Sequence, residues 1–136
     1  MIVDFEGEPS RPAEERRAKS APIRDVAGML RSFAYAAETA ARDVAQRFPE
    51  AGARAHAAAL EWRQFATDLF LDAYAAAAQD SPIWIADAAT RSRLLRLHLI
   101  AKALYEINYE ASNRPDWIEI PVRGVLSILD DEGATA

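Results

Sequence analysis

The chain contains no cysteine, so neither a disulfide bond nor a thiolate metal site can form in it. Basic residues are also in deficit, because 16 Lys and Arg stand against 21 Asp and Glu, a net charge of −5. Without a basic surplus to displace counterions from phosphates, a nucleic-acid partner is not expected. No stretch approaches the roughly 18 uninterrupted apolar residues of a membrane span, and the acidic N-terminus lacks the basic and apolar regions of a signal peptide. The 136 residues therefore predict one soluble, cytoplasmic domain with no membrane partner.

Several catalytic patterns are missing as well. The five glycines are scattered, so no glycine-rich phosphate loop is present. The two histidines, His56 and His98, lie inside expected helices and have no zinc-type spacing to a carboxylate. Ser10, Ser20 and Ser32 lack a partnered histidine for nucleophilic catalysis. The sequence offers no complete catalytic constellation of its own.

What the sequence does contain is helix periodicity. Apolar residues recur every three or four positions in three long segments, as on one face of an amphipathic helix. These segments run from Pro22 to Pro49, from about Glu50 to Gln79, and from about Asp87 to Ser112, and a short final helix is expected from Val122 to Leu129. Prolines end the first and third segments, because the residue before a proline disfavours the helical conformation.

Each long segment is expected to bury its apolar stripe. In the first, the stripe contains Val26, Met29, Leu30, Phe33, Ala37, Ala40, Val44 and Phe48, with Arg31 on the opposite side. The second presents Ala58, Trp62, Phe65, Ala66, Leu69 and Ala73, and the third Leu97, Ile100, Ala101, Leu104 and Ile107. The segments predict an all-α core over residues 23–136.

Evidence for a β-strand is confined to the N-terminus. Residues 2–5 alternate, but they are too few to hold a sheet by themselves. Residues 6–22 mix acidic, basic and proline residues, which is typical of an irregular charged loop. Residues 1–22 are therefore interpreted as a strand remnant and a charged loop in front of the helical core.

Asp4 lies at the end of this short strand, in Asp4-Phe5-Glu6-Gly7. A strand-end aspartate can hold a divalent cation, as in the Asp-Phe-Gly loop of kinases, where it ligates the Mg²⁺ that bridges the ATP phosphates. Acidic residues near a terminus are also commonly just solvated. The motif alone leaves both interpretations open.

Larger blocks of the sequence resemble the C-lobe of bacterial maltokinases. The blocks are Ile2–Pro9, Arg16–Lys19, Arg24–Phe33, Lys102–Glu110, Asn113–Trp117 and Ile120-Pro121. Maltokinases have an aminoglycoside-phosphotransferase-like kinase fold, convert ATP and maltose to maltose 1-phosphate, and are often fused behind a trehalose synthase. The resemblance implies the helical C-lobe subdomain of a protein-kinase-like fold, from a protein of trehalose metabolism and glycogen biosynthesis.

The resemblance also implies roles for individual residues. Asp4 would be the Mg²⁺ ligand, and Asp25 would accept backbone hydrogen bonds from the catalytic loop. Lys102, Tyr105 and Tyr109 match positions of the sugar site. At about 100° per residue, these three and His98 fall within an arc of about 60° on the third helix. Such side chains can bind a sugar, or they can simply extend along the edge of the core, and both interpretations remain.

Other parts that a kinase needs are not in the sequence. The ATP-binding N-lobe and the catalytic loop precede the Asp-Phe-Gly-like strand in such folds, and only three residues precede Asp4. We therefore expect an inactive C-terminal fragment, with Mg²⁺ and ATP bound by the parent kinase and not tightly by this chain. Its exposed core surface would favour self-association. A stand-alone helical binding module derived from a C-lobe, and a half-kinase completed by a separate N-lobe, are the alternatives.

Overall fold

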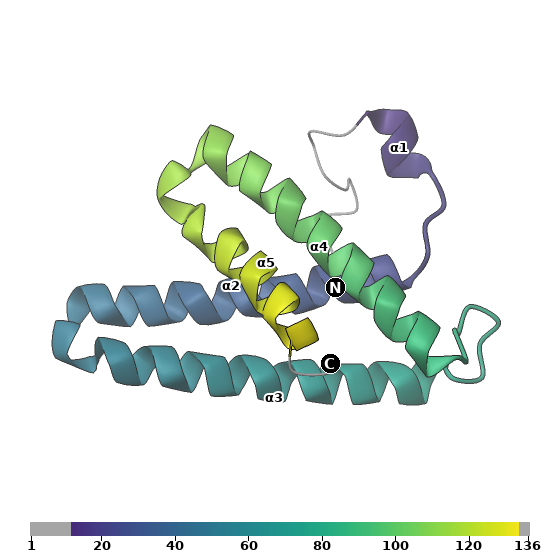
Figure 1. Ribbon diagram of the computed structural model, residues 1–136, viewed down its shortest axis with the longest axis horizontal. Coiled ribbons are helices and arrows are strands. Elements are labelled where there is room, and N and C mark those ends of the chain that lie inside the picture. Colours follow the sequence, from purple (N-terminus) through teal and green to yellow (C-terminus); the bar gives the residue numbers. More distant parts are fainter. Residues whose placement is uncertain (1–11, 134–136) are drawn as a thin grey trace, which may run out of the picture.

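The computed structural model describes residues 12–133 and, of these, the side chains of residues 12–14 and 16–129 (Figure 1). Its helices are α1 (Ala13–Arg17), α2 (Ile23–Arg47), α3 (Gly52–Ala78), α4 (Ala88–Asn113) and α5 (Glu119–Gly133), with 3-10 turns η1 (Pro49–Ala51) and η2 (Pro115–Trp117). Residues 12–133 contain no strand, so the prediction of an all-α fold is confirmed. The predicted strand at residues 2–5, and Asp4 with it, lies outside the described residues. The proposed division after residue 22 stays a prediction.

The ends of the helices follow local chemistry. Phe48 and Arg114 each precede a proline and leave the helical conformation, with φ/ψ of −138°/79° and −147°/68°. This is the effect that a proline has on the residue before it. At the start of α4, the Asp87 carboxylate accepts a hydrogen bond of 2.7 Å from the Thr90 backbone N–H, as an N-cap residue does.

Two boundaries differ from the sequence prediction. The charged loop expected over residues 6–22 contains the short helix α1. The final helix begins at Glu119, three residues before the expected start at Val122. Pro121 lies in its first turn, where a proline costs no helical hydrogen bond because those N–H groups have no partner in the helix.

The chain changes direction between successive long helices. Figure 1 shows α2 and α3 as an antiparallel pair, with α4 crossing α2 and α5 returning antiparallel to α4. Helix α2 contacts α3, α4 and α5, so it lies at the centre of the fold. Its buried face is rich in alanine, which lets neighbouring helix axes approach closely. The buried apolar residues are Ile23, Val26, Ala27, Leu30, Ala34, Ala37, Ala41, Ala78, Ala103 and Ile120.

The apolar stripe predicted for α3 is mostly not the face that is buried. Phe65 is 66% exposed and Leu69 59% exposed, and Trp62 is a surface residue rather than the core residue we expected. Helix α3 instead turns Phe70 toward α2, where its ring lies edge-on to Phe33 with the centroids 5.8 Å apart. Trp62 packs against the same Phe33 ring from one side, at 6.1 Å.

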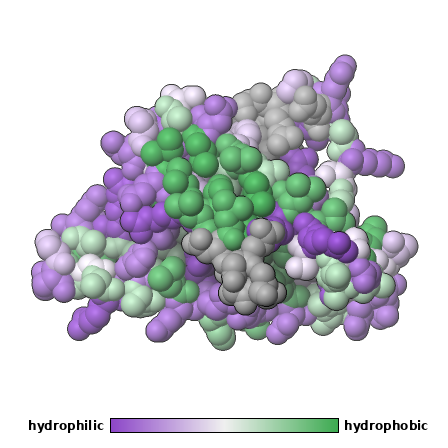
Figure 2. Space-filling view, in the orientation of Figure 1, coloured by the Kyte–Doolittle hydropathy of each residue, from purple (hydrophilic) through white to green (hydrophobic). Residues whose placement is uncertain are grey.

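The apolar stripe predicted for α4 is also turned outward in part. Leu97 and Leu104 are exposed, whereas Ala103, Glu106 and Glu110 are buried. Figure 2 shows apolar side chains gathered over α4 and α5 on the face in view. The exposed large apolar residues of these two helices, other than tyrosine, are Leu97, Leu104, Val122, Leu126 and Leu129. None of the helices in residues 12–133 is long and apolar enough to cross a membrane.

Candidate functional site

One flank of α4 carries an aromatic and cationic stripe made by Lys102, Tyr105 and Tyr109. The two tyrosine rings are stacked, with centroids 6.4 Å apart and planes 20° from parallel. The Lys102 ammonium lies 4.9 Å from the centroid of the Tyr105 ring. Tyr109 is 40% exposed, so its ring is accessible to a ligand. The structure therefore brings together the three residues that the resemblance assigned to a sugar site, and their role stays a prediction.

The inner side of α4 is charged rather than apolar. Arg31 of α2 donates hydrogen bonds from Nε and Nη2 to Oε2 of Glu106, at 2.9 and 2.7 Å. Both side chains are buried, with 5% and 11% of their surfaces exposed. Buried charges are tolerated when they are paired in this way. The prediction that Arg31 lies on the outer side of its helix is wrong, because Glu106 provides it with a partner inside.

Glu110 forms the second buried polar contact between α2 and α4. Its Oε1 accepts a hydrogen bond of 3.1 Å from the Tyr35 hydroxyl. Arg114 donates to both carboxylate oxygens, from Nε to Oε2 at 2.9 Å and from Nη2 to Oε1 at 2.6 Å. Among the described side chains, no buried nitrogen or oxygen lacks a hydrogen-bond partner. The contacts join α2 to the end of α4 that carries the tyrosines.

The segment Asn113-Arg114-Pro115-Asp116-Trp117 begins at the last residue of α4 and is contacted by two arginine side chains. The Arg114 guanidinium lies 5.7 Å from the Tyr109 ring centroid and 5.1 Å from that of Trp117. The guanidinium of Arg42, in α2, lies 5.6 Å from the centroid of the same Trp117 ring. Arg42 also donates a hydrogen bond of 2.7 Å to the backbone carbonyl of Asp116. Cation–π contacts of this kind stabilise the turn and fix its aromatic side chain.

The burial of this polar cluster shifts its acid–base properties. Burial raises the pKa of the Tyr35 hydroxyl well above its usual range, and the neighbouring Glu106 and Glu110 carboxylates raise it further. Tyr35 is therefore a permanent hydrogen-bond donor at neutral pH. Burial also raises the pKa of Glu106, although the Arg31 guanidinium opposes this shift. The hydrogen bonds to Glu110 raise the pKa of Arg114, which keeps its charge.

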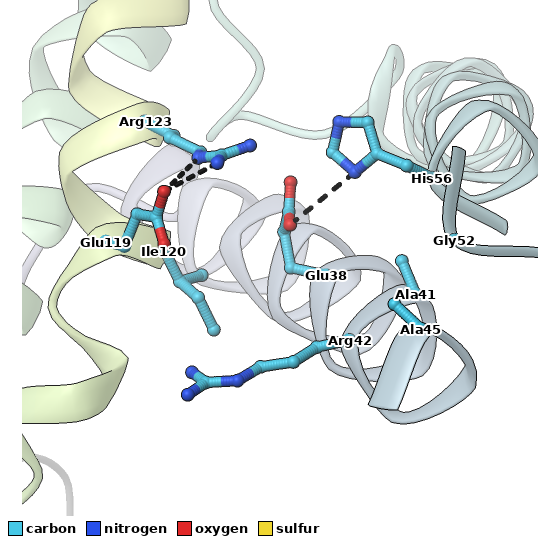
Figure 3. A pocket seen from close by; sticks show the side chains of 9 residues that line it. All are labelled: Glu38, Ala41, Arg42, Ala45, Gly52, His56, Glu119, Ile120 and Arg123. Atoms are coloured by element: carbon cyan, nitrogen blue, oxygen red, sulfur yellow. Dashed lines mark hydrogen bonds and ion pairs between the residues drawn. The ribbon is translucent and has the colours of Figure 1, made fainter. Parts of the chain in front are cut away.

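A separate groove lies between α2, the start of α3 and α5 (Figure 3), with a volume of about 280 Å³. It is lined by Glu38, Ala41, Arg42, Ala45, Gly52, His56, Glu119, Ile120 and Arg123. The His56 Nδ1 lies 3.9 Å from Oε2 of Glu38, and Arg123 Nη2 lies 2.5 Å from Oε1 of Glu119. Two glutamates and two arginines line the groove, so it presents no strong net charge to a ligand.

The other predicted site residues lie elsewhere. Asp25 is exposed in the first turn of α2, and its backbone N–H donates to the Pro22 carbonyl at 3.0 Å. Asp4 is outside the described residues. Among the side chains of residues 12–14 and 16–129, no group of three or more His, Asp or Glu is placed to hold a metal. The assigned roles of Asp4 and Asp25 stay predictions.

The chain is similar along almost its whole length to two curated sugar kinases. The glucosamine kinase of Mycolicibacterium smegmatis is 30% identical over 135 residues, which are 99% of this chain and 31% of that protein. The glucosamine kinase of Streptacidiphilus jiangxiensis is 29% identical over 130 residues, which are 96% of this chain and 27% of that protein. No family model matches the chain.

These similarities relate the chain to a part of sugar kinases. The chain spans less than a third of the length of either relative. Both relatives carry the name of a glucosamine kinase rather than that of a maltose kinase. The relation to sugar kinases therefore stands on the comparison, whereas the identity of the sugar does not follow from it.

Proposed function

We propose that the chain serves as the helical C-lobe part of a sugar kinase and contributes part of the surface that binds the acceptor sugar. The observation that carries this proposal is the stripe of Lys102, Tyr105 and Tyr109 on α4. Aromatic rings pack against the C–H faces of sugars, and hydroxyl and ammonium groups hydrogen-bond their hydroxyls. The similarity to glucosamine kinases supports a sugar as the ligand.

Maltose is our first candidate for that sugar, and glucosamine is the second. The amino group of glucosamine is largely protonated at neutral pH, and two cations flank the tyrosine pair. The Lys102 ammonium lies beside Tyr105, and the Arg114 guanidinium lies beside Tyr109. Like charges repel, so the Lys102 ammonium beside Tyr105 favours a neutral sugar, whereas Glu110 balances the charge of Arg114. The resemblance to maltokinases favours maltose, with maltose 1-phosphate as the product of the complete kinase.

The chemistry itself belongs to the complete kinase. In this proposal Asp4 ligates the Mg²⁺ that accompanies ATP, and Asp25 accepts backbone hydrogen bonds from the catalytic loop. Phosphoryl transfer relies on positioning and on charge stabilisation by several further groups. We therefore propose that residues 12–133 bind and orient the sugar, and that the 136-residue chain has no kinase activity alone. Its partners would be the N-lobe of the kinase and, by the resemblance, a trehalose synthase domain.

Sugar binding is tested directly by calorimetry with the 136-residue chain. Maltose at millimolar concentrations should release measurable heat, and glucosamine should bind more weakly. Substituting Tyr105 by leucine should abolish binding, because leucine fills space without presenting an aromatic face. The Lys102→Met variant should reduce the difference in affinity between maltose and glucosamine, since it removes a positive charge that repels glucosamine.

Tyr74→Leu provides a matched control, because Tyr74 lies on α3 and packs against Trp84 with ring centroids 5.9 Å apart. This variant should bind maltose as the unmodified chain does. If neither sugar gives heat, or if Tyr74→Leu and Tyr105→Leu lose binding equally, the assignment of the stripe to sugar binding is wrong.

A stand-alone interaction module is the second candidate function. The observation that favours it is the exposed apolar surface of α4 and α5, which includes Leu97 and Leu104. Surfaces of this kind commonly mark protein contacts. Two copies of the chain could associate through this surface. Alternatively, the remainder of a kinase could cover it. Sedimentation of the chain at several concentrations tests for self-association through this surface, which would give a concentration-dependent mass.

A further inference from the structure

Arg114 occupies an unusual position at the end of α4. Its backbone leaves the helix, with its N–H still bonded to the Glu110 carbonyl at 2.8 Å. The side chain then folds back along the last turn, where the guanidinium meets both oxygens of the Glu110 carboxylate. Glu110 is only 2% exposed, so this carboxylate is a fixed anchor. Arg114 is therefore held at a defined place on the surface by a buried group.

The anchored guanidinium has two aromatic rings close to it. Tyr109 and Trp117 lie within 5.7 and 5.1 Å of its central carbon, measured to the ring centroids. Only arginine combines a planar face for aromatic rings with a fork that binds both oxygens of a carboxylate. A lysine at this position would keep the charge and lose both features. The Tyr109 ring thus lies next to both the Arg114 guanidinium and the Tyr105 ring.

We propose that Arg114 is a positioning residue that fixes the Tyr109 ring in its stacked arrangement with Tyr105 and so presets the sugar-binding surface of α4. The inference rests on the proposed function, because it assigns Arg114 a task in the same sugar site. Glu110 and Tyr35 extend the support inward to α2, through the carboxylate that Arg114 and the Tyr35 hydroxyl share. A ring that is held before the sugar arrives loses less conformational freedom on binding, which improves affinity.

The test combines a measurement without sugar and a measurement with it, on the 136-residue chain. The chain has four tyrosines, so incorporation of 3-fluorotyrosine gives one fluorine NMR signal for each, and Tyr109→Phe identifies the signal of interest. Arg114→Lys should shift or broaden the Tyr109 signal and leave the Tyr74 signal unchanged. With maltose, Arg114→Lys should weaken binding roughly two- to fivefold, the size of one cation–π contact. In a Tyr109→Leu background it should have no further effect on binding, because Arg114 acts through Tyr109.

Arg123→Lys is the matched control, since Arg123 makes the same kind of contact with a glutamate four residues earlier, away from the tyrosines. The proposal is overturned if the Tyr109 signal is unchanged in Arg114→Lys, or if both lysine variants weaken maltose binding equally. Additive losses in the double variant would also overturn it. If the unmodified chain binds no sugar, the proposed function fails, and a Tyr109 signal that still moves in Arg114→Lys shows that the positioning contact exists without that function.

Discussion

Adding one methyl group at Gly124 of α5 should destabilise the protein, although the same change stabilises most helices. Glycine in the middle of a helix is less favourable than alanine by about 0.5–1 kcal/mol. At Gly124, however, a Cβ would lie only 2.1 Å from Nη1 of Arg31 and 2.8 Å from its Cζ. The α5 backbone therefore packs directly on the Arg31 guanidinium, and the added methyl group of Gly124→Ala would occupy the space that the guanidinium fills.

The size of the effect follows from how firmly that guanidinium is held. A flexible surface arginine would simply move away, but Arg31 is buried and donates two hydrogen bonds to Glu106. Breaking a buried ion pair costs about 3–5 kcal/mol. Set against the gain in helix propensity of up to about 1 kcal/mol, Gly124→Ala should lower the free energy of unfolding by about 2–4 kcal/mol.

Urea unfolding followed by far-ultraviolet circular dichroism measures this difference, provided that the denaturant dependence is unchanged between variants. Gly28→Ala is the matched control, because Gly28 lies inside α2 and a Cβ there would meet nothing within 4 Å. That variant should be more stable than the unmodified chain by about 0.5–1 kcal/mol. If Gly124→Ala is stabilising as well, Arg31 is not wedged between Glu106 and α5, and the account of this contact is wrong.

Three further predictions test other parts of the fold. Phe70→Ala should lower the free energy of unfolding by about 2 kcal/mol, whereas Phe65→Ala should stay within about 0.5 kcal/mol; the opposite order would restore the apolar face that the sequence predicted for α3. The pKa of Asp87 is lowered by its hydrogen bond from Thr90, so its carboxylate stabilises the fold above its unfolded pKa and loses this effect as pH falls through the folded pKa. Asp87→Ala should therefore lower the melting temperature at neutral pH and make no difference at strongly acidic pH, while Asp87→Asn should keep the cap without that pH dependence. Leu104→Gln should reduce self-association in sedimentation experiments with little change in unfolding, and an unchanged mass would exclude this surface as the contact.

The lengths and ends of the three long helices, α2, α3 and α4, could be predicted because their causes are local. Pro49 and Pro115 constrain the residues before them, and apolar residues recur with the helix period between such breaks. What the period does not determine is which face of a helix meets its neighbour. In α3 the largest apolar side chains, such as Phe65, lie outside because the contact with α2 is made by smaller residues and by Phe70.

The buried face of α4 could not be predicted for a related reason. Glu106 and Glu110 look like surface residues in the sequence, since an unpaired carboxylate is costly to bury. Their burial depends on Arg31 and Tyr35, which lie on another helix, and only the tertiary fold reveals that pairing. The resemblance named the stripe on α4, and helical spacing alone placed its members close together. The contribution of Arg114 could not be predicted from helical spacing. It depends on α4 ending at this residue and on the burial of the Glu110 carboxylate that Arg114 binds.

The contacts between α2 and α4 also affect the order of folding. Arg31 and Glu106 are separated by 75 residues, and so are Tyr35 and Glu110. Contacts this distant in the chain carry a loop-closure cost, so we expect them to form after the local helical contacts. Interactions absent from the transition state act on the unfolding rate and leave the folding rate almost unchanged. We therefore expect the buried ion pair to set how long the folded state persists rather than how quickly it is reached.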